Sequence, residues 1–206
     1  MAIAIFFTGH WFSSLFSQTF FLHRYSAHHM FEMNKFWERF FHIFTFISQG
    51  SSYLNARAYA ILHRLHHAHS DTKNDPHSPV FYKSVFGMMW RTKKIYSDLV
   101  NDRIKVKEKL LNNIPNWQGL EKIADNWITR IAWGFFYVLF YILFSPSWWL
   151  LLLLPVHFLM GPIHGAIVNW CGHKYGYQNF KNTKDKSRNT LPFDFLTLGE
   201  LFRNNH

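Results

Sequence analysis

The longest uncharged stretches of the chain alternate with polar, histidine-rich segments, and the first stretch covers residues 2–22. As a helix it would extend about 30 Å, which matches the hydrocarbon core of a bilayer. A secretory signal peptide is the competing interpretation. No Lys or Arg precedes this stretch and no small-residue cleavage site follows it, so the pattern favours a transmembrane helix at about 2–22.

A second uncharged stretch runs over residues 131–170 and is interrupted by a Ser-Pro-Ser sequence at 145–147. It is long enough for two membrane crossings. We therefore expect a transmembrane hairpin with arms at about 127–145 and 148–170, the second kinked at Pro155. A hairpin buried in a soluble protein is the alternative, and the abundance of Trp and Leu in both arms argues against it.

The third candidate, at about 36–56, ends in the polar sequence SQGSSYLN, which makes a crossing expensive. We expect a helix lying in the plane of the membrane. Segments 23–39, 57–126 and 171–206 then share one side of the membrane. They carry nearly all of the Lys and Arg, so the positive-inside rule assigns that side to the cytoplasm.

Together these stretches predict an all-α integral membrane protein, with transmembrane helices and a cytoplasmic, His-rich helical cap, as one domain over 1–206. Composition agrees, because only 17% of residues are charged and 20% are aromatic. The net charge of +10 suits an anionic membrane surface better than nucleic acid, because the basic residues lie in blocks between uncharged stretches. A single Cys excludes a disulfide framework and a multi-cysteine zinc site.

The 14 histidines are clustered, and one cluster has helical spacing. His63, His66 and His67 stand at i, i+3 and i+4, on one face of a helical turn. A solvated or pH-sensing face is the alternative to a metal site. His23 and His28 would point about 140° apart in an unbroken α-helix, so as partners they require a helix end or a metal between elements.

Further candidates follow the hairpin: Asn169 and His173 at i and i+4, and the last residue, His206. His69 lies off the face of its helix and His77 lies in the turn DPHSP, so both are weaker candidates. The remaining histidines in or beside apolar stretches are expected to pack between helices, namely His10, His42, His157 and His164.

Many His and no Cys pair favour a borderline metal such as iron or zinc. More than four converging histidines exceed one tetrahedral zinc site, which favours two metals and a dinuclear iron site that activates O2. HExxH is absent, so a metalloprotease of that type has no support. A His-rich metal transporter or sensor would place its ligands along a pathway near the bilayer midplane, whereas these lie at one face.

The sequence resembles the membrane fatty acid desaturases, in particular the acyl-CoA Δ9 (stearoyl-CoA type) branch and its bacterial relatives. TFFLHRYSAH looks like the first histidine box, and LHRLHHAHSDTKNDPHSP looks like the second with its following SDT and DPH. NWCGHKYG resembles the NxxxH element, and LGELFRNNH the approach to the third box. These elements occur in the family's order over nearly the whole chain, from about Gln18 onwards.

The resemblance implies a diiron desaturase that uses O2 and two electrons to introduce a cis double bond into a saturated acyl-CoA or acyl-lipid, at Δ9. The electron donor would be a ferredoxin, rubredoxin or cytochrome b5-like protein. Basic residues of the cytoplasmic surface would attract CoA phosphates. The implied iron ligands are His23, His28, His63, His66, His67, His173 and His206, with Asn169 holding an iron-bound water.

The chain departs from the family pattern in two ways. The third box normally ends in two adjacent His, and this chain stops at the first of them, so we expect a C-terminal truncation that could leave the chain inactive. Three residues earlier, where the family commonly has His or Gln, stands Arg203, which cannot ligate a metal. A diiron membrane hydroxylase is the nearest alternative, because the same centre can place oxygen on the chain.

Overall fold

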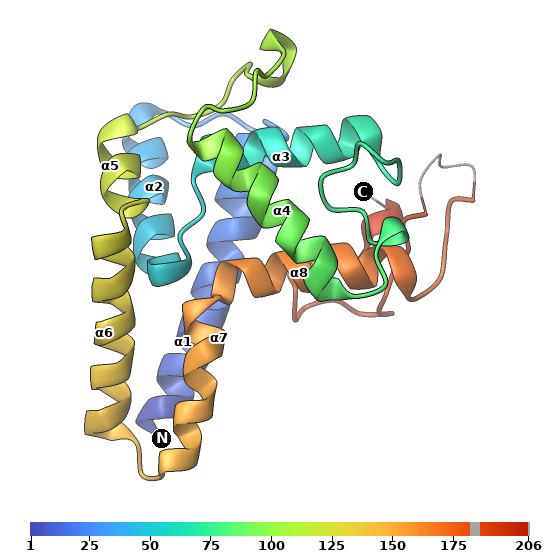
Figure 1. Cartoon of the computed structure of the whole chain (residues 1–206). Coiled ribbons are helices and arrows are strands. Elements are labelled where there is room, and N and C mark those ends of the chain that lie inside the picture. The colour runs from blue at the N-terminus through green and yellow to red at the C-terminus, as the bar shows by residue number, and fades with distance from the viewer. Residues whose placement is uncertain (182–185, 206) are drawn as a thin grey trace.

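The computed structural model describes residues 1–181 and 186–205 and shows a narrow helical stalk beneath a wider helical lobe (Figure 1). The described part of the chain forms no β-strand and only two isolated bridges, Tyr177–Asn189 and Asn189–Phe202, which confirms the all-helical prediction. The α-helices are α1 (Ala2–Phe16), α2 (Lys35–Gln49), α3 (Ala56–His69), α4 (Val85–Val100), α5 (Gln118–Ala124), α6 (Trp127–Phe144), α7 (Leu154–Phe158) and α8 (Met160–Lys174).

The stalk consists of α1, α6 and α7, with the α6–α7 connection at the far end from the lobe (Figure 1). Ile3, Tyr137, Tyr141 and Leu154 form its small buried core. Most other apolar side chains of α6 face outwards, and Phe135 is 69% exposed. By length and composition α6 is the one helix among the described residues able to cross a membrane, or one of two if α7 and α8 with the segment before them count as a bent span.

The second arm of the expected hairpin is not straight. The segment Trp148–Phe158 meets α8 at an angle of 71°, and the break lies at Leu159 rather than at Pro155. Pro155 stands in the first turn of α7, where proline is tolerated. Pro162 has no N–H to donate to the carbonyl of Phe158, and the Ser51 hydroxyl donates to that carbonyl instead, at 3.4 Å.

The helix expected at about 36–56 is shorter, because α2 ends at Gln49. Gly50 has a φ of +50°, which favours glycine, and a Cβ there would collide with the hydroxyl of Tyr137. Asn55 then begins α3, since its side chain accepts a hydrogen bond from the amide of Ala58 at 2.9 Å. The outward face of α2 is apolar, with Phe36, Phe40, Ile43 and Ile47 exposed at helical spacing.

Helix α3 lies at the centre of the lobe. Ala58, Ile61 and Leu62 pack against Leu99 of α4, and Ala56 packs in a second buried cluster with Phe21 and Leu22 of the helix that continues α1. Small alanine side chains allow the neighbouring helices to approach closely. This packing fixes α3 between two elements, so that His63 and His66 are buried in the lobe.

Candidate metal centre

Four imidazole rings converge in the lobe, and we call them the first cluster: His23, His28, His63 and His67. Nε2 of His28 lies 3.1 Å from Nε2 of His23 and 2.9 Å from Nε2 of His63. Nε2 of His67 also lies 2.9 Å from Nε2 of His63. Nitrogens so close together suit a shared metal ion, because ligands about 2.0–2.1 Å from one ion lie about 3 Å from each other.

A π-helix explains how His23 and His28 meet. The segment Ser17–Ala27 continues α1 with π-helical geometry, and the amide of His28 donates to the carbonyl of His23 at 3.0 Å, five residues back. In this wider helix residues five apart point in more similar directions than they do in an α-helix. The two side chains that an α-helix would hold apart therefore reach the same point.

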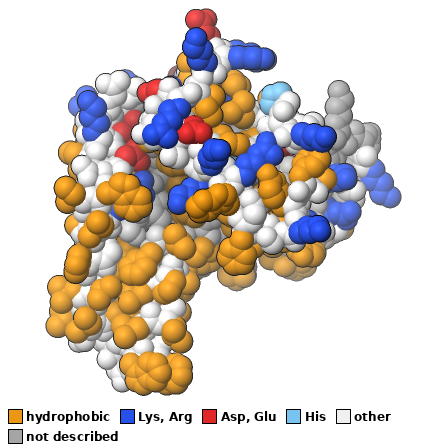
Figure 2. All heavy atoms as spheres, in the orientation of Figure 1, with side chains coloured by type: hydrophobic (Ala, Val, Ile, Leu, Met, Phe, Trp, Pro, Cys, Tyr) orange, Lys and Arg blue, Asp and Glu red, His pale blue; other side chains and the backbone are white. Residues whose placement is uncertain are grey.

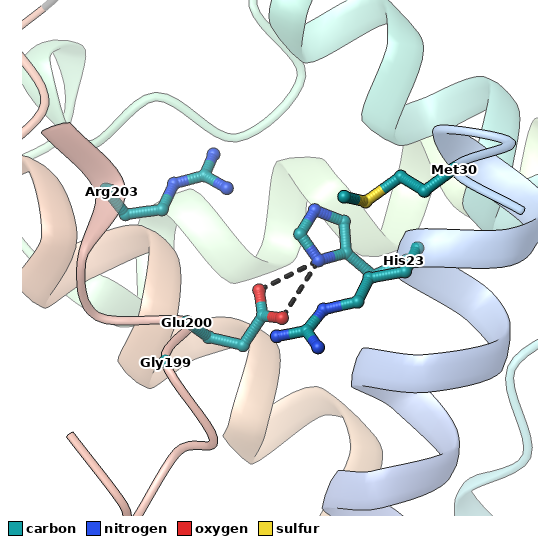
Figure 3. A pocket seen from close by; sticks show the side chains of 6 residues that line it. His23, Met30, Gly199, Glu200 and Arg203 are labelled. Atoms are coloured by element: carbon teal, nitrogen blue, oxygen red, sulfur yellow. Dashed lines mark hydrogen bonds and ion pairs between the residues drawn. The ribbon is translucent and has the colours of Figure 1, made fainter. Parts of the chain in front are cut away.

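Glu200 orients His23 from the C-terminal segment. Nδ1 of His23 lies 2.9 Å from Oε1 and 2.9 Å from Oε2 of Glu200, and both side chains are nearly buried (Figure 3). The carboxylate holds the ring proton on Nδ1 and leaves the lone pair of Nε2 directed at the cluster. A cavity of about 150 Å³ lies beside this pair, lined by His23, Arg24, Met30, Gly199, Glu200 and Arg203.

A second group of histidines lies next to the first, and we call it the second cluster: His66, His77 and His173, with Asp71 and Asp75. Nδ1 of His66 donates to both carboxylate oxygens of Asp75 at 2.9 Å, and Nδ1 of His173 donates to Oδ2 of Asp71 at 3.1 Å. The rings of His66 and His77 lie 4.3 Å apart between centroids, and those of His66 and His173 lie 5.3 Å apart. Asp75 also accepts from the amide of His77, which turns this residue inwards.

Arg203 reaches into the second cluster. Its Nη2 donates to Nε2 of His66 at 2.8 Å, and the side chain is buried. His66 thus has its proton on Nδ1, towards Asp75, and its lone pair on Nε2, towards the guanidinium.

Burial and neighbouring charge favour the neutral form of His28, His63, His66 and His77. Desolvation, with the nearby His23 and His67, lowers the pKa of His28 to about 3. Burial likewise lowers the pKa of His63, His66 and His77 well below the usual value. A neutral imidazole is the form that ligates a metal, so the first cluster fits a divalent ion of the iron or zinc type.

The predicted ligands therefore separate into two groups. His23, His28 and His63 meet in the first cluster with His67 beside His63, while His66 and His173 lie in the second. Asn169 directs its amide to the carbonyl of Gly165 at 2.9 Å, on its own helix. His206 lies outside the described residues. The four expected packing histidines contact other side chains or backbone: His10 pairs with His157, His157 with Tyr141, His164 with Trp11, and His42 with Glu38.

Sequence reasoning missed several members of the site. His77 was set aside because it lies in a turn, yet it is buried and groups with His66 and Asp75. Three carboxylates orient histidines of the site, namely Asp71, Asp75 and Glu200. Their spacing in the sequence does not indicate this role. The only sequence signal was their position inside the segments SDTKNDPH and LGELFRNNH.

Comparisons with known proteins identify several relatives of this chain. The "Delta-9 desaturase-like 5 protein" of Arabidopsis thaliana is 30% identical over 203 residues, covering 92% of this chain and 60% of that protein. The "sn-1 stearoyl-lipid 9-desaturase" of Synechocystis sp. is 29% identical, covering 89% of this chain and 54% of the relative. The "Hex-5-enoyl-[acyl-carrier protein] acetylenase" of Moorena producens is 25% identical, with 96% and 64% covered.

The chain thus spans about 54% to 64% of the lengths of these relatives. No solved structure matches it. The sequence profile described as "Fatty acid desaturase" matches residues 1–206, and so the chain belongs to the fatty acid desaturase family.

Proposed function

We propose that the chain carries the catalytic domain of an O2-dependent fatty acyl desaturase, an oxidoreductase that introduces a cis double bond at Δ9 into an acyl-CoA or acyl-lipid. The observation that carries the proposal is the close approach of the Nε2 atoms of His23, His28 and His63, with Nε2 of His67 beside that of His63, in a member of this family. Two relatives, a Delta-9 desaturase-like protein and a stearoyl-lipid 9-desaturase, support Δ9 as the position of the double bond.

Iron bound at the first cluster would supply the O2-dependent oxidation that an unactivated C–H bond requires. The residues of this chain hold the ligands in place: Glu200 fixes the tautomer of His23, and α3 presents His63 and His67 together. The family resemblance implies a second iron. The second cluster does not fit one as it stands, because the lone pair of His66 is occupied by Arg203.

The distribution of side chains supports an integral membrane protein with the site on the cytoplasmic face. Hydrophobic side chains cover the stalk in the view of Figure 2, and Lys and Arg gather on the lobe. The outward apolar face of α6 fits lipid, and the exposed apolar face of α2 fits the membrane interface. The acyl chain would then enter from the bilayer, and a ferredoxin, rubredoxin or cytochrome b5-like donor would approach from the cytoplasm.

Reconstitution in lipid vesicles with Fe2+, O2 and a reduced ferredoxin tests the proposal. Stearoyl-CoA and stearoyl-lipid are supplied separately, and the products are identified by gas chromatography with mass spectrometry. We expect a Δ9 monounsaturated product that the variant His63→Ala does not form and the variant His69→Ala does, since His69 shares α3 but lies outside both clusters. A hydroxylated product would instead identify a hydroxylase, and metal binding without O2 consumption would favour a transporter or sensor.

A further inference from the structure

The second cluster is built to hold a cation. Asp71 and Asp75 are carboxylates with side chains 5% and 0% exposed, each hydrogen-bonded to one histidine of the cluster. Asp71 also accepts from the hydroxyl of Ser78 at 2.7 Å and from the amide of Lys186 at 2.6 Å, which favours its ionised form. Two buried negative charges require a positive partner, because an uncompensated buried charge is strongly destabilising.

Arg203 places a positive charge beside His66, at the point where a metal would bind. His66 would bind a metal ion through the lone pair of its Nε2. In the structure Nη2 of Arg203 donates a hydrogen bond to this lone pair at 2.8 Å. The guanidinium cannot itself ligate, and a divalent ion beside it would experience direct charge repulsion.

The protein makes room for this side chain. Gly172 on α8 lies against the aliphatic part of Arg203, and a Cβ at Gly172 would lie only 2.5 Å from Cγ of Arg203. The residue next to it is His173, a member of the second cluster. Figure 3 shows the side chain of Arg203 extending from the C-terminal segment into the space beside His23 and Glu200. The position of the guanidinium is therefore fixed by packing as well as by its hydrogen bond.

We propose that the guanidinium of Arg203 takes the place of a metal ion in the second cluster, so that this chain binds one metal ion, at the first cluster. The inference rests on the metal centre of the proposed function but not on its acyl chemistry. It departs from the two-iron centre that the family resemblance implies.

Metal content per chain tests the proposal. The purified chain and its variants are loaded anaerobically with Fe2+ and separately with Co2+, freed of excess metal, and measured by plasma mass spectrometry. We expect about one ion per chain for the unaltered protein and about two for Arg203→His, which removes the cation and adds an imidazole. The matched control Arg103→His changes an exposed arginine outside both clusters, and it is expected to leave the value near one.

Two variants locate the bound ion without altering Arg203. His63→Ala is expected to lose it, and His66→Ala is expected to retain it, because only the first cluster is occupied. The proposal is wrong if the unaltered chain binds two ions or none, if Arg203→His stays at one, or if His66→Ala loses the metal. A chain that binds one ion but forms no unsaturated product would leave this inference standing and overturn the proposed function.

Discussion

Replacing Glu200 with Gln tests how the C-terminal segment controls the first cluster. The substitution keeps the size of the side chain and an oxygen that can accept the proton of His23 Nδ1, but it removes the negative charge. In the structure both carboxylate oxygens lie 2.9 Å from Nδ1, and the side chains of His23 and Glu200 are only 3% and 11% exposed. Low exposure means that solvent screens the interaction weakly, so the charge contributes to the basicity of Nε2.

We expect Glu200→Gln to weaken metal binding about 10- to 100-fold, which corresponds to ~1.4–2.7 kcal/mol. Competition of Co2+ between the protein and a chromophoric chelator measures the dissociation constant. Glu108→Gln is the matched control, since Glu108 is exposed and outside the centre. Circular dichroism establishes that both variants keep their helical content. An unchanged dissociation constant in Glu200→Gln would show that Glu200 does not set the ligand properties of His23, and our account of the first cluster would be wrong.

Three further predictions concern packing, pH and the membrane. Gly172→Ala should lower the free energy of unfolding by ~1–3 kcal/mol through overlap with Arg203, and a double-mutant cycle with Arg203→Ala should show most of that cost relieved. Burial raises the pKa of Glu121 from 4.5 to about 6, so the contribution of this carboxyl group to stability should fall as the pH rises through this interval. The melting temperature of Glu121→Gln relative to that of the unaltered protein should therefore be higher at about pH 7.5 than at about pH 5. Phe135→Arg should reduce the carbonate-resistant fraction in membranes, because Arg at the centre of a spanning helix costs ~2.5–3.5 kcal/mol; unchanged extraction would indicate that α6 faces water.

Much of the fold could be predicted from the lengths of the uncharged stretches of the sequence, because a long uncharged stretch has few structural alternatives. The prediction of α6 depended on nothing else. The bend at Leu159 was missed because it depends on a tertiary contact: Ser51, more than a hundred residues away, satisfies the carbonyl that Pro162 leaves without a partner. Local sequence identifies prolines, but it does not show which of them the surrounding structure allows to break a helix.

The histidines show the same limit at the level of the site. A spacing of five between His23 and His28 indicated that an α-helix could not unite them, and the π-helix that does so has no sequence signature of its own. His77 was set aside because turns are usually solvated, whereas Asp75 folds this turn inwards by accepting from the amide of His77 and the ring of His66. The meeting of His23 with His28 and the burial of His77 both depend on backbone geometry and hydrogen bonds that the spacing of the histidines does not show.

The three histidines of the second box, His63, His66 and His67, lie on one face of α3 but divide between the two clusters. At about 100° per residue, His67 lies about 40° to one side of His63 and His66 about 60° to the other. One turn of α3 therefore serves two neighbouring clusters, and His63 and His67 share the first while His66 belongs to the second. Because α3 holds both clusters rigidly, a change of occupant in one, whether metal ion or guanidinium, alters the electrostatic potential at the other. Arg203 is thus close enough to influence a metal ion bound at the first cluster, because its charge acts on His28 and His63 while its hydrogen bond lies in the second cluster.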